Sequence, residues 1–84
     1  MAEDVIDGLT PPELTFGMKA VGLSFKPSGD TDVYRIQSMY AEIIDHLNKM
    51  RWTDRSEKAR LLSIAITEAQ TASMWAVKAI TWQD

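Results

Sequence analysis

Few side chains in this sequence have the chemistry of a catalytic or metal centre. His46 is the only histidine and there is no cysteine, so the usual pairs of a nucleophile and a base are not available. Glu42 precedes His46 by four residues, but one histidine and one carboxylate do not make a metal site. We therefore expect His46 to be a solvated surface residue, and the protein to have no enzyme activity, no metal and no cofactor.

Glu68 is unusual because it lies in a long apolar segment, residues 61–80, in which Lys78 is the only other charged residue. A buried carboxylate is costly unless it is paired. Glu68 could act as a general base. The favoured interpretation is that it bonds to a Lys, an Arg or a hydroxyl group across a subunit interface.

A binding function has better support, first from the polar residues of that apolar segment. Thr67, Gln70, Thr71 and Ser73 are uncharged and can form hydrogen bonds. Such groups can recognise the polar edge of a ligand without the cost of burying a charge. The alternative is that they bond to one another where helices pack.

A second candidate group lies near the start of the chain. Phe25 and Lys26 place an aromatic ring beside a cation, directly before a turn that contains Pro27 and Ser28. A nucleotide base can stack on such a ring while the ammonium group meets a phosphate. The alternative is a structural role, in which Phe25 belongs to a strap that covers the helices.

Two helices joined by a short link would position these groups, and this predicts an all-α antiparallel hairpin. The first should span residues 31–50, with Asp30 or Thr31 as its cap. The second should begin after an N-cap at Ser56 and end at Ile80 or Thr81. The apolar residues of the first helix recur every three or four positions. They are Val33, Ile36, Tyr40, Ile43, Leu47 and Met50, with Ile44 widening the stripe.

The N-terminal part of the chain is predicted to be a flexible lead-in followed by an extended strap. Residues 1–12 are expected to be a flexible lead-in, and residues 13–84 to form one domain. Before the first long helix, Val21, Leu23 and Phe25 alternate with the small residues Gly22 and Ser24. This period of two residues favours an extended strap over residues 13–29.

The second helix has too much apolar surface for one hairpin to bury, which indicates a homo-oligomer. An alanine seam would allow another helix to approach closely, and a bulkier stripe lies beside it. The alanines are Ala65, Ala69, Ala72, Ala76 and Ala79. The bulkier stripe is Ile64, Thr67, Thr71, Trp75, Lys78 and Trp82.

The charge balance and hydropathy exclude several other functions. A net charge of −3 without a basic block disfavours binding to a DNA or RNA duplex. The polar residues of the second helix make it a poor membrane span. The start of the chain is too weakly apolar for a signal peptide, and with no cysteine this favours the cytoplasm.

The run from Ala59 to Ile80 resembles the signature helix of the phage anti-CBASS sponges, whose helical-hairpin domain the anti-Thoeris sponges share. Its matching positions are Thr67, Gln70, Met74, Trp75 and Ala79. The Phe25-x-Pro27 sequence also resembles the aromatic–proline entry of this family, and the resemblance covers about residues 23–82.

The resemblance implies that the protein binds and sequesters cyclic oligonucleotide second messengers without cleaving them, and so blocks antiphage signalling in the cytoplasm of the infected host. Cyclic dinucleotides are the first candidate ligands and cyclic trinucleotides the second. The resemblance also implies a compact oligomer, typically a hexamer, with pockets at subunit boundaries. The alternative is a small oligomeric phage adaptor with no nucleotide ligand.

The resemblance further implies roles for individual residues. Phe25 would stack on a base, within a candidate set that also includes Pro27 and Ser28. The basic residue of the family falls near Gln37, which is not basic, so Arg35 or Lys26 would meet the phosphates. A separate pocket near the symmetry axis would be lined by Thr67 and Gln70.

Overall fold

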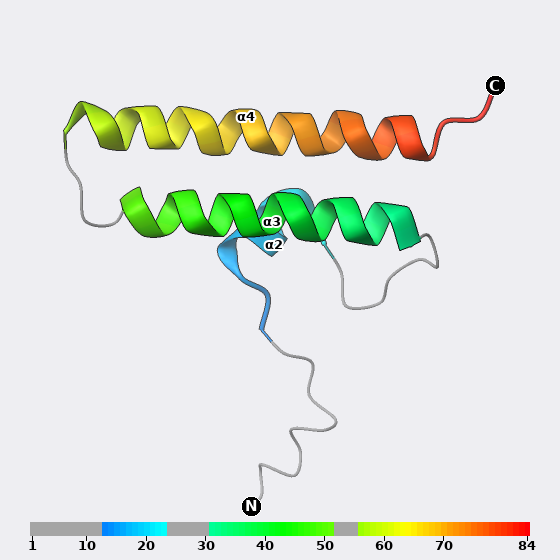
Figure 1. The fold of residues 1–84 in the computed structure, drawn as a ribbon, viewed down its shortest axis with the longest axis horizontal. Helices are drawn as coiled ribbons and strands as arrows, with labels where there is room; N and C mark the ends of the chain where they lie inside the picture. Colours follow the sequence, from blue (N-terminus) through cyan, green and yellow to red (C-terminus); the bar gives the residue numbers. More distant parts are fainter. Residues whose placement is uncertain (1–12, 24–30, 52–55) are drawn as a thin grey trace, which may run out of the picture.

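Three helices make up the described part of the chain. The computed structural model describes residues 13–23, 31–51 and 56–84. The helices are α2 (Phe16–Val21), α3 (Thr31–Arg51) and α4 (Glu57–Ile80). The two long helices lie side by side and antiparallel, and α2 lies against α3 (Figure 1). These ranges contain no strand, so the predicted all-α helical hairpin is confirmed, while the homo-oligomer remains a prediction.

The ends of α4 follow the capping residues that the sequence indicates. The Ser56 side chain accepts a hydrogen bond from the backbone N–H of Lys58 at 3.2 Å, and Thr81 is the C-cap. In the first turn, Arg60 is hydrogen-bonded to Glu57 and holds the pKa of that carboxyl below its ordinary value of 4.5. A carboxylate at this position also interacts favourably with the positive end of the helix dipole.

The predicted extended strap is wrong for residues 16–21, because they form α2. A reciprocal cap starts this helix. The Thr15 hydroxyl accepts from the N–H of Met18 at 3.1 Å, and the Met18 sulfur accepts from the N–H of Thr15 at 3.5 Å. Gly22 ends the helix in a left-handed conformation with φ 75°. Residues 1–12 and 24–30 lie outside the described residues, so the flexible lead-in and the cap at Asp30 remain predictions.

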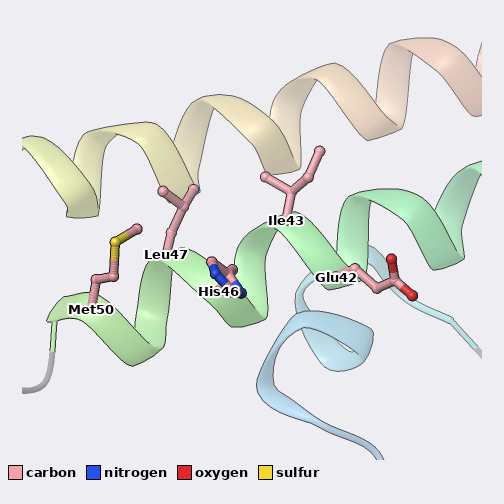
Figure 2. A pocket seen from close by; sticks show the side chains of 5 residues that line it. All are labelled: Glu42, Ile43, His46, Leu47 and Met50. Atoms are coloured by element: carbon pink, nitrogen blue, oxygen red, sulfur yellow. The ribbon is translucent and has the colours of Figure 1, made fainter.

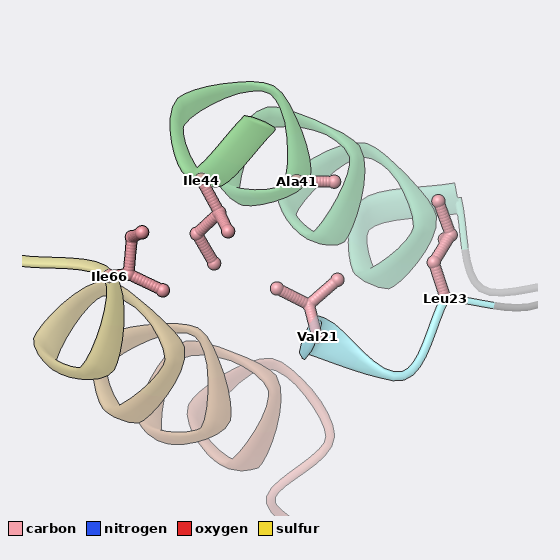
Figure 3. Close-up of a cluster of buried hydrophobic side chains, with 5 residues drawn as sticks. All are labelled: Val21, Leu23, Ala41, Ile44 and Ile66. Atoms are coloured by element: carbon pink, nitrogen blue, oxygen red, sulfur yellow. The ribbon is translucent and has the colours of Figure 1, made fainter. Parts of the chain in front are cut away.

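A small core joins all three elements. Val21 and Leu23 come from the N-terminal segment, Ala41 and Ile44 from α3, and Ile66 from α4 (Figure 3). Ile44 has no exposed surface at all. The N-terminal segment therefore does cover the helices, although it does so as a helix and not as an extended strap.

The stripe predicted to bury α3 is displaced around the helix. Ile43 is 49% exposed and Met50 is 39% exposed, while Ala41 and Ile44 are buried. The reason is that α3 has two packing partners, α2 and α4, and its buried face is centred between them. The sequence period shows that α3 is amphipathic, but it cannot show that a short helix packs beside it and shifts the buried face.

Arg51 fastens the closed end of the hairpin. Its Nη1 donates to the Ser63 hydroxyl at 2.9 Å and its Nη2 donates to the Asn48 side-chain oxygen at 2.7 Å. Its guanidinium also lies 5.7 Å from the centroid of the Phe16 ring. Arg51 thus contacts α2, α3 and α4, and it fixes the register between the two long helices.

Candidate ligand-binding site

Of the residues predicted to bind a cyclic dinucleotide near the start of the chain, only some lie in the described part of the structure. Phe25, Lys26, Pro27 and Ser28 lie outside the described residues, so their roles remain predictions. Arg35 lies in the second turn of α3 with its side chain exposed, where a ligand phosphate could reach it.

Gln37 has a structural contact that the sequence does not reveal. Its side chain is half-buried, and its Nε2 donates to the backbone carbonyl of Val21 at 3.1 Å. Val21 is the last residue of α2, so this bond ties the end of the short helix to α3. Sequence reasoning missed the contact because no local pattern links positions 16 residues apart.

The second candidate group uses its hydroxyl protons inside α4. Thr67 is exposed and donates to the carbonyl of Ser63 at 3.2 Å, and Thr71 donates to the carbonyl of Thr67 at 3.1 Å. Ser73 is buried and donates to the carbonyl of Gln70 at 2.8 Å. A hydroxyl whose proton is already used keeps lone pairs on its oxygen. Thr67 therefore presents an acceptor to its surroundings.

The two candidate groups lie at different levels of the hairpin. The bond between Arg51 and Ser63 sets the register of the antiparallel helices. Arg35 precedes Arg51 by 16 residues along α3, and Thr67 follows Ser63 by four residues along α4. Because the helices are antiparallel, both steps lead away from the link that joins them. At about 1.5 Å per residue, Arg35 and Thr67 are separated by roughly 18 Å along the axis. Within one chain these two residues therefore lie far apart along the hairpin.

The outer face of α4 is apolar and exposed. Trp75 is 66% exposed and Trp82 is 61% exposed, and Ile64 is also exposed. The ammonium of Lys78 lies 5.4 Å from the Trp75 ring centroid and 5.8 Å from that of Trp82. Glu68 is exposed as well. The bulky stripe therefore lies on the surface of the single chain, as expected of a helix that has apolar residues on two faces.

A shallow groove of about 390 Å³ runs along the exposed edge of α3. The groove is lined by Ile43 and Leu47, whose side chains extend from α3 toward α4, and by Met50, His46 and Glu42 (Figure 2). His46 is exposed, as predicted. The residues that the structure describes include no cluster of three or more possible metal ligands. None of the described helices has the length and apolar character needed to cross a membrane.

Comparison with known proteins assigns this hairpin to a family. The family model described as Acb2/Tad1, hairpin domain, matches residues 18–81, from within α2 to the end of α4. The chain therefore belongs to this family of phage anti-CBASS and anti-Thoeris cyclic-nucleotide sponges. The family sequesters cyclic nucleotides and is not catalytic. No curated protein and no solved structure matches the chain.

Proposed function

We propose that this protein sequesters cyclic oligonucleotide second messengers in the cytoplasm of an infected host, without cleaving them, and so blocks antiphage signalling. The observation that carries the proposal is the family match over residues 18–81, which includes the whole α3–α4 hairpin. A sponge needs a rigid pocket, because a preorganised site loses little entropy on binding and releases its ligand slowly. Packed helices supply such a scaffold.

Cyclic dinucleotides are the first proposed ligands. Phe25 would stack on a base, beside Pro27 and Ser28, and Lys26 or Arg35 would meet the phosphates. The exposed position of Arg35 supports its candidacy. Gln37 is a weaker candidate for ligand contact, because its amide already donates to the Val21 carbonyl.

Cyclic trinucleotides are the second proposed ligands, at a separate site that includes Thr67 and Gln70. The Thr67 proton is used by the Ser63 carbonyl, so its oxygen can accept from a ligand but offers no free donor. This favours the amino group of a base over a phosphate oxygen as its partner.

A homohexamer is the proposed assembly, with the outer face of α4 covered by other subunits. The support is that Ile64, Trp75 and Trp82 are large apolar residues that are exposed in the single chain. Glu68 lies among these residues, and in the assembly it would pair with a cation or hydroxyl of a neighbouring subunit.

Calorimetry tests the ligand directly. The pure protein is titrated with cyclic di-AMP, cyclic di-GMP, cyclic GMP–AMP and cyclic tri-AMP. We expect micromolar or tighter binding of at least one of them, and the intact nucleotide should be recovered after the protein is denatured. A linear product would identify a nuclease. No binding to any of the four would favour the adaptor alternative.

Variants of the N-terminal group test the proposed contacts. Phe25→Ala should weaken cyclic dinucleotide binding by about 1–3 kcal/mol, while Phe25→Tyr should largely preserve it. Lys26→Met should weaken binding, and it should make the affinity less sensitive to salt concentration, because an ionic contact is removed. The matched control is Lys58→Met, since Lys58 is exposed in the first turn of α4. If Phe25→Ala breaks the assembly without affecting bound ligand, Phe25 is a structural residue.

A further inference from the structure

The side of α3 that faces away from α2 is apolar and exposed. Asp45 accepts a hydrogen bond from Gly17 and so points toward α2, while Ile43, two residues earlier, lies about 160° around the helix from it. Met39, Ile43 and Met50 are all exposed. The groove of about 390 Å³ lies along the same side. The described part of the chain therefore leaves this side of α3 open to a partner.

The residue spacing on this side is that of a helix that packs against another helix. The outer stripe of α3 alternates steps of three and four residues and consists of Ile36, Met39, Ile43, His46 and Met50. This alternation keeps a narrow apolar seam against one neighbouring helix over several turns. A single polar residue in such a seam, here His46, can fix the register of the pair. The spacing therefore favours a helix over a small molecule as the occupant of the groove.

The charges beside the outer stripe indicate that this helix is a second copy of α3. Glu42 and Lys49 are exposed and directly precede Ile43 and Met50. Among the described residues, neither takes part in an ion pair. In an antiparallel pair of helices such flanking positions face the same positions of the partner, so Glu42 can face the partner's Lys49. In a parallel pair Glu42 would instead face the partner's Leu47, which is apolar.

The same charges distinguish between the antiparallel registers. A shift of one heptad from the favoured register would place Glu42 against the partner's Glu42, and Arg35 against the partner's Lys49. Like charges would then meet at every flanking position. A shift of two heptads would pair Arg35 with the partner's Glu42, but it would place the charged Asp32 in the seam against the partner's Ile43. The favoured register has neither fault.

We propose that two copies of this chain pair antiparallel through the outer stripe of α3, with Glu42 of each copy bonded to the partner's Lys49. The seam contacts are Ile43 with the partner's His46, and Met50 with the partner's Met39. This surface is separate from the outer face of α4. A hexamer with dihedral symmetry needs two kinds of contact, so both surfaces can serve in one assembly. The inference does not depend on nucleotide binding.

Paired cysteines test the register directly, because the chain has no cysteine of its own. Glu42→Cys and Lys49→Cys are combined in one full-length variant, which is then oxidised. Seven residues of helix separate the two Cα atoms by about 10.5 Å, and a disulfide needs less than about 7 Å, so a bridge can form only between chains. A twofold pair closes two such bridges. A denaturing gel without reductant should therefore show a covalent dimer, while each single-cysteine variant, oxidised in the same way, should remain a single chain.

Charge reversal is a second test that needs no oxidation. Glu42→Lys and Lys49→Glu should each lower the oligomer mass in light scattering, because like charges then meet across the pair. The variant with both substitutions should recover the wild-type mass, since it restores both ion pairs. Lys58→Glu is the matched control, because it makes the same change of charge at an exposed position of α4, and it should match the wild type.

Several results would overturn the inference. One is the absence of a covalent dimer, and another is a ladder of trimers and longer chains, which would mean a head-to-tail contact. A dimer from Glu42→Cys alone would show the register that is shifted by one heptad. An oligomer mass that neither charge reversal lowers would exclude the ion pairs. A monomeric wild type would overturn this inference and the proposed hexamer together, whereas a wild type that binds no nucleotide would overturn the proposed function and leave this inference standing.

Discussion

Gly17→Ala is the substitution for which the structure gives the most direct expectation. An added Cβ would lie 2.1 Å from the Ala41 carbonyl oxygen, 2.9 Å from its carbonyl carbon and 3.0 Å from the Asp45 side-chain carbon. Ordinary contact begins at 3.4 Å, so α2 would have to move by about 1.3 Å from the Ala41 oxygen. Two of the three atoms belong to the backbone of α3, which cannot turn aside as a flexible side chain can.

The size of the effect follows from two destabilising contributions and one that offsets them. Overpacking of this kind costs about 1–3 kcal/mol. The hydrogen bond from Gly17 to the Asp45 carboxylate would be weakened, and bonds to charged groups contribute about 1.5–3 kcal/mol. Alanine offsets about 1 kcal/mol through its higher helix propensity. We expect a net loss of about 2–4 kcal/mol in the free energy of unfolding.

Gly22→Ala is the matched control, because the same substitution causes no steric clash there. Gly22 has φ 75°, and an added Cβ would have no atom within 4 Å. Its cost is the left-handed backbone alone, about 1–2 kcal/mol. Both variants are unfolded in urea at one fixed protein concentration, since assembly makes stability depend on concentration. The reasoning fails if Gly17→Ala is as stable as the wild type, or if Gly22→Ala is the more damaging of the two.

Two further predictions concern the hairpin end and the outer face of α4. Arg51→Met should lower the free energy of unfolding by about 1–3 kcal/mol, and Arg51→Lys should not restore it, because lysine lacks the forked donors that reach both Ser63 and Asn48. Urea unfolding measures both variants. Trp75→Ala should shift the protein toward smaller species in light scattering at micromolar concentration, because Trp75 is exposed within one chain. An unchanged oligomer mass would show that another surface holds the assembly.

The two long helices could be predicted from the sequence because their signals are local. Ser56 caps α4 as expected, and Thr31 begins α3 as expected. Helix periodicity and capping act over one or two turns, so a single sequence contains the information. For the same reason the antiparallel hairpin followed from the short link between the helices.

The short helix and its contacts could not be predicted, because they depend on tertiary packing. The alternation of Val21 and Leu23 suggests an extended chain, yet both side chains are buried by a helix followed by a left-handed glycine. The bond from Gln37 to Val21 joins residues that are distant in the sequence. The capping residues Thr15 and Met18 were the available local signal, and a sulfur in the place of the usual Glu or Gln made that capping box hard to recognise.

Because the core of the single chain is small, its stability should depend on contacts between subunits. In the described ranges the buried apolar side chains are Val21, Leu23, Ala41, Ile44, Leu62 and Ile66. A core of this size supplies little net stability to a chain of 84 residues. If subunits cover the outer face of α4, folding and assembly are coupled, and substitutions there should reduce stability and ligand binding together. Substitutions at Asp45 and Gln37 would instead remove hydrogen bonds between α2 and α3, which lie away from that face. Among these variants, one that loses both oligomer mass and ligand affinity therefore points to the outer face of α4.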